Sequence, residues 1–249
     1  MKNIMLTMEY DGTSYAGWQR QPNAMTVQQK VEEALQDLTG ETVGVIGSGR
    51  TDSGVHARGQ TANFRTDSSI PSEKFSFALN SRLPGDIRIV CSREVSRDFH
   101  ARFSATGKKY KYSMIVRPQD TAIGYRYLYH ICVPLDVPAM KEAAGYFKGT
   151  HDFASFMAAG SPVRTTVRTV TDVRLDWDDP FLYFMVKGDG FLYHMVRIMA
   201  GTLIEVGRGR IDSLSVPEIL QARDRKRAGP TAPPQGLSLE EVYYEEIFS

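Results

Sequence analysis

The residues best suited to chemistry lie in one short run, Gly47 to Ala57, with the sequence GSGRTDSGVHA. It places three ionisable side chains, Arg50, Asp52 and His56, within seven positions, among glycines that let the backbone turn tightly. The run lacks the Gly-Lys-Ser/Thr ending of a Walker phosphate loop, and its third glycine is not at the spacing of a dinucleotide fingerprint. Both kinds of phosphate-binding loop are therefore disfavoured.

The triplet Asp52-Ser53-Gly54 also matches the Asp-Ser/Thr-Gly loop of aspartic proteases. Those enzymes need two carboxylates that share a proton, and the sequence holds a single such triplet. A protease would therefore require a symmetric dimer that brings two copies together. The plainer interpretation is a surface turn in which the aspartate side chain caps a backbone N–H. The loop alone leaves both interpretations open.

The elements around this loop alternate between strands and helices. Apolar residues alternate in a strand around Ile4–Met8 that ends at Asp11-Gly12. Thr26-x-x-Gln29 resembles a capping box, and apolar residues at helical spacing follow it until Gly40. We expect further strands at 43–46, 60–64, 87–91 and 110–114, and a helix after Pro71. The β-α-β-β-α-β order of the first half is that of the ferredoxin-like fold.

The second half shows a similar order of elements, but less clearly. Its expected elements are a helix after Asp136, strands at 166–177 and 181–187, a helix from Leu192 to Gly207, a helix after the capping box Ser215-x-x-Glu218 and a strand near 242–247. The Pro/Gly-rich stretch 228–236 is too short for an interdomain linker and predicts an ordered loop. We therefore predict an α+β chain of two ferredoxin-like (RRM-like) halves, residues 1–105 and 106–249, that share a continuous, mainly antiparallel sheet.

The composition excludes several classes of protein. The 249 residues carry 30 Lys+Arg and 29 Asp+Glu, a formal net charge of +1. This balance excludes a histone-like polycation, although a polarised surface can still bind a polyanion. Two cysteines without CxxC spacing and five histidines without ligand spacing argue against disulfide and metal sites. Because no signal peptide or long apolar run is visible, we expect a cytoplasmic protein outside the membrane.

Five stretches resemble the tRNA pseudouridine synthase A family, in the same order along the chain. They are EYDGTSYAGWQRQP (9–22), GRTDSGVHARGQ (49–60), KKYKYSM (108–114), GFLYHMVRIMAGTL (190–203) and APPQGLSL (232–239). The resemblance covers essentially the whole chain, and RTDSGVHA is its most specific part. The chain does not depart from the family pattern at the positions that matter.

The resemblance implies an isomerase (an intramolecular transferase) that modifies RNA by base flipping, without a cofactor or a metal. Its substrate would be uridine at positions 38, 39 and 40 of tRNA, in the anticodon stem-loop. It would work as a homodimer with a central cleft shared between subunits, and DNA is not an expected partner. Asp52 would be the catalytic carboxylate, acting as a nucleophile or as a base.

The same resemblance gives three further residues substrate-binding roles. Tyr110 would stack on the flipped uracil, and Arg50 would help to hold the flipped state. Arg197 would keep Asp52 ionised in a closed pocket, because a nearby cation favours the charged carboxylate. Leu237 would form an apolar wall. The patterns alone also allow plainer roles, with Tyr110 in the core and Arg197 as a solvated arginine off the apolar stripe of its helix.

Two competing functions are weighed against this one. A non-catalytic RNA-binding module also suits ferredoxin-like sheets, but it has no need of Asp52 among basic residues and would carry an aromatic RNP1 string. A dimeric aspartic hydrolase would need an apolar peptide cleft. Two histidines fall near the matched motifs: His56 is expected to brace the loop, and His194 neighbours the face of Arg197 and is a weaker candidate for RNA contact.

Basic residues gather in two stretches. The local charge balance is +5 over residues 97–127 and +3 over residues 197–227, whereas acids gather at 172–179 and 240–246. Basic stretches interleaved with aromatics suit an RNA backbone with exposed bases. We therefore expect tRNA binding there, with an affinity that falls steeply as salt increases.

Overall fold

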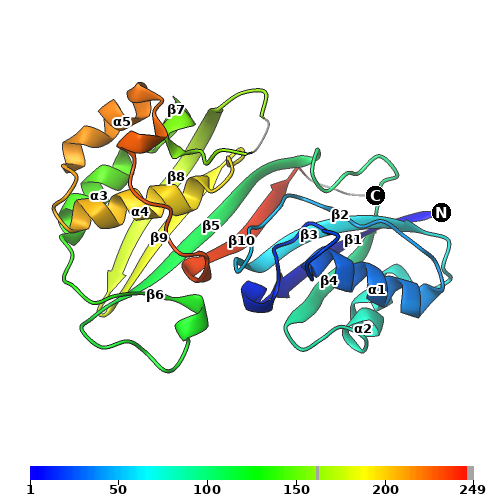
Figure 1. The fold of residues 1–249 in the computed structure, drawn as a ribbon. Helices are drawn as coiled ribbons and strands as arrows, with labels where there is room; N and C mark the ends of the chain where they lie inside the picture. Colours follow the sequence, from blue (N-terminus) through cyan, green and yellow to red (C-terminus); the bar gives the residue numbers. More distant parts are fainter. Residues whose placement is uncertain (161–162, 246–249) are drawn as a thin grey trace. The chain divides into compact units, whose positions relative to one another are not determined.

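A computed structural model describes residues 1–160 and 163–245, which form two compact units. The first unit holds Met1–Gly107 together with the chain from Ser238 onward, and the second holds Lys108–Leu237. In each unit, helices cover one face of a β-sheet (Figure 1). This mixture of helices and strands confirms the predicted α+β class.

The first unit carries the Asp52 loop between two paired strands. Its strands are β1 (Lys2–Tyr10), β2 (Ile46–Gly47), β3 (His56–Thr66), β4 (Ile87–Val95) and β10 (Leu237–Tyr244). The sheet order in this unit is β4-β1-β3-β10, and β2 also pairs with β3. β1 pairs antiparallel with β3 and β4, whereas β10 pairs parallel with β3, at Ser238↔His56. The loop therefore leads directly into β3, a strand with partners on both sides.

Two helices cover one face of this sheet, α1 (Val27–Thr39) and α2 (Phe75–Asn80). The side chain of Thr26 accepts a hydrogen bond from the backbone N–H of Gln29, and Gly40 ends the helix in the left-handed region at φ 73°. Val27, Val31 and Leu35 of α1 are fully buried, as are the alternating residues Ile4, Leu6 and Met8 of β1, whereas Leu38 near the end of α1 is half-buried. The predicted strand and capped helix are both confirmed.

The second unit has the sheet order β5-β9-β8-β7, with β6 paired to β5. Its strands are β5 (Ala105–Val116), β6 (Tyr129–Ile131), β7 (Gly149–Asp152), β8 (Val167–Asp178) and β9 (Phe181–Gly188), and its helices are α3 (Val137–Gly145), α4 (Met195–Gly207) and α5 (Val216–Ala222). The pairs β5–β9, β9–β8 and β8–β7 are antiparallel. These elements hold the positions of Tyr110, on β5, and Arg197, on α4.

The helix α4 is the centre of the second unit. Every residue of α4 except Arg197 and Glu205 is buried. A helix that is apolar on nearly all sides must be surrounded by protein, and here the segment 228–236 lies along it. Ala232 exchanges two hydrogen bonds with Arg197, and Gly229 donates one to Thr202. The Pro/Gly-rich stretch is thus an ordered loop, as predicted.

Two predictions of local structure are wrong. The short strand expected at 43–46 is only Ile46–Gly47. The second capping box does not form, because Ser215 has helical backbone angles and its side chain makes no capping bond. A 3-10 turn, Ser213–Ser215, precedes α5 directly, and Asp212 caps that turn by accepting from the backbone N–H of Leu214.

The last strand changes the division of the chain. The sequence predicts halves of 1–105 and 106–249, and the first boundary is close to the observed one after Gly107. The chain from Ser238 onward lies with the first unit instead, because β10 pairs with β3 there. The strand expected near 242–247 begins earlier, at Leu237, and the structure shows it as far as Tyr244. Residues 246 and 247 of the expected strand lie outside the part of the chain that the structure describes.

Candidate active site

Asp52 lies on the loop between β2 and β3 in the first unit. Its side chain is half-buried, and Arg50, two residues earlier, is exposed. The backbone of Val55 donates a hydrogen bond to the carbonyl of Asp52 at 3.1 Å, which closes a tight turn at the tip of the loop. Gly54 within this turn has a φ of 76°, a conformation that glycine adopts without steric penalty.

Buried polar side chains hold this loop from beneath. The hydroxyl groups of Tyr10 and Thr51 are 2.8 Å apart, and the amide of Gln60 donates to the carbonyl of Gly49 and accepts from the hydroxyl of Ser48. Burial raises the pKa of the Tyr10 phenol well above its usual range, so the hydroxyl stays protonated at neutral pH. The residue before Asp52 is therefore fixed by a side-chain bond from β1.

A second loop, Asp11–Trp18, packs against the Asp52 loop backbone to backbone. Trp18 donates its N–H to the carbonyl of Thr51 at 3.2 Å, and Gly54 donates to the carbonyl of Tyr15 at 3.3 Å. A Cβ atom on Gly17 would lie 2.4 Å from the carbonyl oxygen of Thr51 and 3.0 Å from the carbonyl carbon of Asp52. Only glycine fits this approach, and the positive φ of 87° at Gly17 favours it further.

His56 joins the same two loops. It is 5% exposed, and its Nδ1 atom accepts a hydrogen bond from the backbone N–H of Gly12 at 3.0 Å. A Cβ atom on Gly12 would lie 2.0 Å from the carbonyl oxygen of Val55, so this contact also needs glycine. The imidazole thus braces the loop, as the sequence suggests. The two glycines and Tyr10 were not predicted as site residues, although all three lie in the matched stretch EYDGTSYAGWQRQP.

Tyr110 lies on β5 in the second unit and is 8% exposed. Its ring packs edge-on against Phe191, with centroids 5.2 Å apart. Two residues on, Tyr112 is fully buried and donates its hydroxyl to the carbonyl of Pro233 at 2.8 Å. Both tyrosines are therefore buried, Tyr112 completely and Tyr110 slightly less so. Leu237, at the start of β10, is 5% exposed.

Arg197 is not the solvated arginine that the plainer interpretation expected. It is half-buried, and its Nε atom donates to the carbonyl of Ala232 at 2.8 Å. The N–H of Ala232 in turn donates to the carbonyl of Arg197 at 3.1 Å. The helix is buried nearly all round, so the position of Arg197 off one apolar stripe could not reveal this. His194 caps the same helix in the left-handed region, at φ 60°.

The predicted site residues thus fall into two sets. Arg50 and Asp52 share one loop of the first unit, and Tyr110 and Arg197 lie on separate elements of the second. Within the second unit, the segment 228–236 contacts both elements, since Pro233 binds Tyr112 and Ala232 binds Arg197. Each set is held by buried groups, so each side chain starts from a fixed backbone.

The basic run Arg223–Arg227 is largely engaged by the protein itself. Arg223 forms an ion pair with Asp152 at 3.0 Å, and Arg227 approaches Glu218 at 4.0 Å. The guanidinium of Arg225 donates to the carbonyl of Gly229 and to the hydroxyl of Thr231, and burial lowers its pKa. A sum of charges along the sequence therefore overstates how much positive charge this stretch can offer to RNA.

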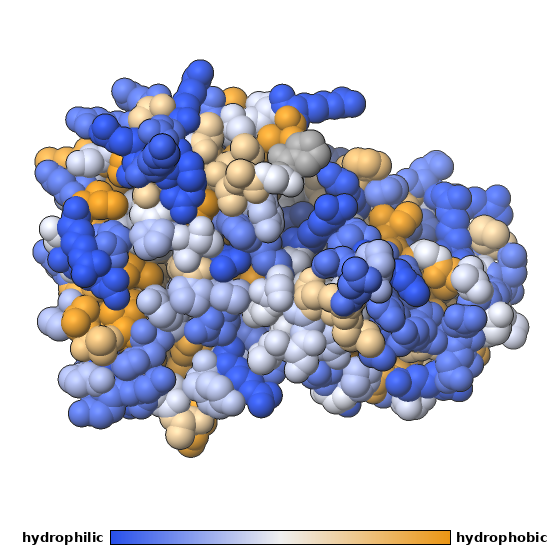
Figure 2. Space-filling model, viewed as in Figure 1, coloured by the Kyte–Doolittle hydropathy of each residue, from blue (hydrophilic) through white to orange (hydrophobic). Residues whose placement is uncertain are grey.

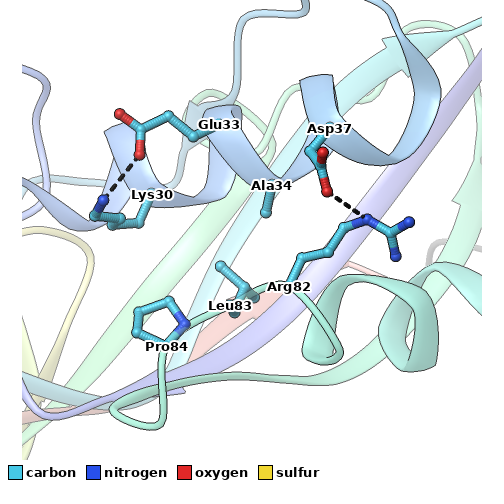
Figure 3. A pocket seen from close by; sticks show the side chains of 7 residues that line it. All are labelled: Lys30, Glu33, Ala34, Asp37, Arg82, Leu83 and Pro84. Atoms are coloured by element: carbon cyan, nitrogen blue, oxygen red, sulfur yellow. Dashed lines mark hydrogen bonds and ion pairs between the residues drawn. The ribbon is translucent and has the colours of Figure 1, made fainter.

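A surface pocket of about 400 Å³ lies between α1 and the chain that follows α2 (Figure 3). Its charged side chains neutralise one another, because Lys30 pairs with Glu33 and Asp37 with Arg82. It therefore has no excess of cations for an RNA backbone. Within residues 1–160 and 163–245, no cluster of three or more ligating side chains suits a metal ion, and no helix there is long and apolar enough to cross a membrane.

Comparison with known proteins assigns the family. The fold and the site define an α+β protein with one carboxylate on a rigid, glycine-dependent loop. A family model described as tRNA pseudouridine synthase matches residues 6–104 and 143–245, well over half of the chain. The chain belongs to the tRNA pseudouridine synthase family.

Curated relatives match end to end. The chain is 53% identical to tRNA pseudouridine synthase A of Acetivibrio thermocellus and 51% identical to tRNA pseudouridine synthase A 2 of Clostridium perfringens. Both alignments cover 98% of this chain and all of the relative. Among solved structures, a chain of a Cbf5-Nop10-Gar1 complex aligns at 12% identity and a TM-score of 0.36, over 81% of this chain and 45% of that one.

Proposed function

We propose that this protein isomerises uridine to pseudouridine in tRNA and that Asp52 is its essential catalytic residue. Membership of the family supports the reaction. The observation that carries the role of Asp52 is a half-buried carboxylate on a loop whose backbone is fixed from two sides. A group held this way keeps its orientation while a substrate binds, which is the usual requirement for catalysis.

The reaction needs little besides this carboxylate. The bond between N1 of uracil and C1′ of ribose breaks, the base turns, and a bond forms between C5 and C1′, with the C5 proton lost and N1 protonated. Atoms and electrons balance without an oxidant, so we propose that no cofactor takes part. Asp52 can act by attack on C6, by attack on C1′ or by removal of the 2′ proton, and all three use one ionised carboxylate.

We propose that three other residues bind the substrate. Tyr110 stacks on the uracil with a ring whose orientation is held by Phe191, and Arg50 contacts the flipped nucleotide from an exposed position. Arg197 favours the ionised form of Asp52. In support, its Nε atom and its backbone are already held by Ala232, which fixes the direction of the guanidinium.

The finer assignments rest on the family resemblance. We propose that the target uridines are at positions 38, 39 and 40 in the anticodon stem-loop and that the enzyme is a cytoplasmic homodimer. Two free cysteines, Cys91 and Cys132, are compatible with a reducing compartment. We also propose that each half is ferredoxin-like; the first unit supports this, because β1 pairs antiparallel with β4 and β3, and β2 pairs antiparallel with β3.

Replacing one carboxylate tests the proposal directly. Asp52→Asn removes the charge but keeps the shape, so we expect pseudouridine formation on an unmodified tRNA transcript to fall by about 10³-fold or more. The matched control is Asp37→Asn, since Asp37 is 72% exposed on α1 and pairs with Arg82. Products are mapped by carbodiimide adducts, and tRNA binding is titrated in parallel. Full activity of Asp52→Asn would refute the assignment.

The same assay separates the competing functions. A non-catalytic RNA-binding module would bind the transcript but form no pseudouridine, even as the wild-type protein. An aspartic hydrolase would cleave peptides and bind the transcript weakly. We expect neither result, and we expect Asp52→Asn to bind tRNA nearly as well as wild type, because Tyr10, Gln60 and Trp18 also hold the loop.

A further inference from the structure

One aromatic side chain of the first unit is conspicuously exposed on a well-anchored segment. Phe103, in the segment Ser96–Ser104 between β4 and β5, is 77% exposed. Hydrophobic residues on the face drawn in Figure 2 form small separate groups among hydrophilic ones, so an exposed aromatic must be judged by its own surroundings. A single exposed hydrophobic residue is ordinary in a protein surface, so a binding role for Phe103 must rest on how the ring and its neighbours are held.

The segment is anchored from beneath by two buried asparagines. The side-chain amide of Asn3 donates to the carbonyls of Ser96 and Phe99, at 2.8 and 3.0 Å. Asn63 accepts from the backbone N–H of Ala101 at 2.9 Å and donates to the side-chain oxygen of Asn3 at 2.9 Å. These bonds join the segment to both β1 and β3, so its backbone has little freedom.

The ring of Phe103 is also held from one side. The ring of His100 stacks on it, with centroids 4.2 Å apart and planes at 29°. The Nδ1 atom of His100 accepts from the backbone N–H groups of Arg102 and Phe103, at 3.2 and 3.3 Å, which fixes the imidazole. Phe103 is therefore preorganised, and most of its surface still faces solvent.

One cation lies against the ring, and a second is exposed on the same segment. Arg102 holds its guanidinium carbon 5.7 Å from the ring centroid, and Arg97 is exposed in the preceding turn, which Phe99 closes by donating its N–H to the carbonyl of Ser96. Within the described part of the chain, neither guanidinium forms an ion pair with a carboxylate, although Asp98 lies between them in sequence. This contrasts with Arg223, whose charge is matched by Asp152.

We propose that Arg97, Arg102 and Phe103 form a second RNA-binding site, in which Phe103 stacks on an unpaired base and the two arginines bind phosphates. An exposed ring suits any base, and guanidinium groups pair with phosphate oxygens. The proposal rests on the proposed function, since it takes tRNA as the ligand. A second copy of the chain could also cover the ring, but it would have to supply carboxylates for both arginines. A polyanion such as RNA supplies negative charge to both directly.

The site is distant from Asp52. Asn63, which anchors the segment, lies seven residues along β3 from His56, next to the Asp52 loop. At about 3.3 Å per residue of strand, these two positions of β3 are roughly 20 Å apart. The stacked base would therefore belong to a different part of the tRNA from the uridine that reacts, and contact here would select and orient the tRNA rather than assist the chemistry.

The structure supplies a matched control for the aromatic ring. Phe77, on α2 in the same unit, is 74% exposed and has Lys74 at 5.7 Å from its centroid. We expect Phe103→Ala to weaken binding of an unmodified tRNA transcript by about ten-fold or more, as for other bases stacked on aromatic residues. Phe77→Ala should bind like wild type. Thermal unfolding of both variants should match wild type, because neither ring is buried.

The arginines give an independent readout. Arg97→Gln and Arg102→Gln should each reduce the slope of log affinity against log salt concentration by about one, because each phosphate contact releases about one counterion. Phe103→Ala should leave this slope unchanged. Wild-type affinity and salt slope in all three variants would overturn the proposal.

Two further measurements separate the alternatives. If Phe103→Ala shifts the oligomeric state in light scattering and leaves RNA binding unchanged, the ring is a protein contact and the proposal is wrong. Pseudouridine formation is measured in the same samples over a range of tRNA concentrations, where we expect Phe103→Ala to need about ten-fold more tRNA for its half-maximal rate. A wild-type protein that binds tRNA but forms no pseudouridine would refute the proposed function and leave the binding result intact.

Discussion

The Asp52 loop and the Arg197 helix are both rigid, but they are made rigid in different ways. The loop is held by polar contacts: Tyr10 and Gln60 reach it with side-chain hydrogen bonds, and Trp18 with a backbone one. The helix α4 is held by apolar burial and by close contact with the segment 228–236, where Gly201 meets the carbonyl of Pro230.

The two kinds of support have different consequences: contacts of the loop decide where Asp52 lies, and contacts of α4 decide how stably the second unit folds. Polar bonds are directional, and each contributes only about 1 kcal/mol, so losing one shifts a loop without unfolding the domain. Apolar contacts around a central helix carry much of the folding free energy of their unit, so disturbing them affects every residue there. Variants of the loop should therefore lose activity first, and variants of the helix should lose folding first.

The largest effect is expected for Gly201→Ala in the helix. A Cβ atom there would lie 1.8 Å from the carbonyl oxygen of Pro230, which is backbone and cannot rotate away. Overpacking a buried helix in this way should lower the free energy of unfolding by about 3 kcal/mol or more. Urea unfolding measures this, with Gly145→Ala as the control, because Gly145 ends α3 with open space around it. Equal midpoints for the two variants would contradict the comparison.

Gly17→Ala should have an intermediate effect, with the larger loss in activity. The new methyl group would push against the backbone of Thr51 and Asp52, and a displacement of about 1 Å at a catalytic group can lower the rate about 10²-fold. The control is Gly40→Ala, which has a similar φ of 73° but nothing within 4 Å. Both variants should lose about 1 kcal/mol of stability from backbone strain. Single-turnover rates should fall in Gly17→Ala alone. Equal losses of rate in Gly17→Ala and Gly40→Ala would show that backbone strain, and not displacement of Asp52, is responsible.

The smallest effect is expected for Tyr10→Phe, which removes one buried hydroxyl. The variant should lose about 1 kcal/mol of stability and less than ten-fold in activity, because Thr51 can turn its hydroxyl to another partner. A double-mutant cycle with Thr51→Val isolates the bond, and we expect a coupling of roughly 0.5–1.5 kcal/mol. Strictly additive effects of the two substitutions would mean that this bond does not hold the loop.

The sequence predicted the loop but not what holds it. Asp52 and Arg50 stand in a contiguous motif, so they could be found by reading along the chain. Gly17 and Tyr10 act through contacts with Thr51 and Asp52, which are 34 to 41 positions away, and no local pattern encodes such a contact. The two glycines in the first loop were visible, but the need for close backbone approach appears only once the two loops are placed together.

The elements were predictable where one local signal dominated. Thr26 caps α1 as its spacing indicates, whereas Ser215 does not cap α5, because a 3-10 turn continues into that helix. The role of Arg197 could not be decided from an apolar stripe, since α4 is buried on nearly every side. The charge of the basic run 223–227 was overestimated because Arg223 forms an ion pair with Asp152 and Arg225 donates hydrogen bonds to backbone carbonyls of a later loop.

The place of β10 has a consequence for the order of events during synthesis. The first unit is completed by the last described strand, whose Tyr244 packs on Met5, Val95, Phe99 and Ala101. A ribosome adds about 5–20 residues per second, so making Lys108–Leu237 takes on the order of ten seconds. Throughout that time the growing chain carries an incomplete first unit, with one edge of β3 and an apolar cluster uncovered. The segment that bears Phe103 gains the hydrogen bond from Tyr244 to Ala101 only once β10 has been made, so chains that end before β10 should lack a finished form of the proposed RNA-binding surface.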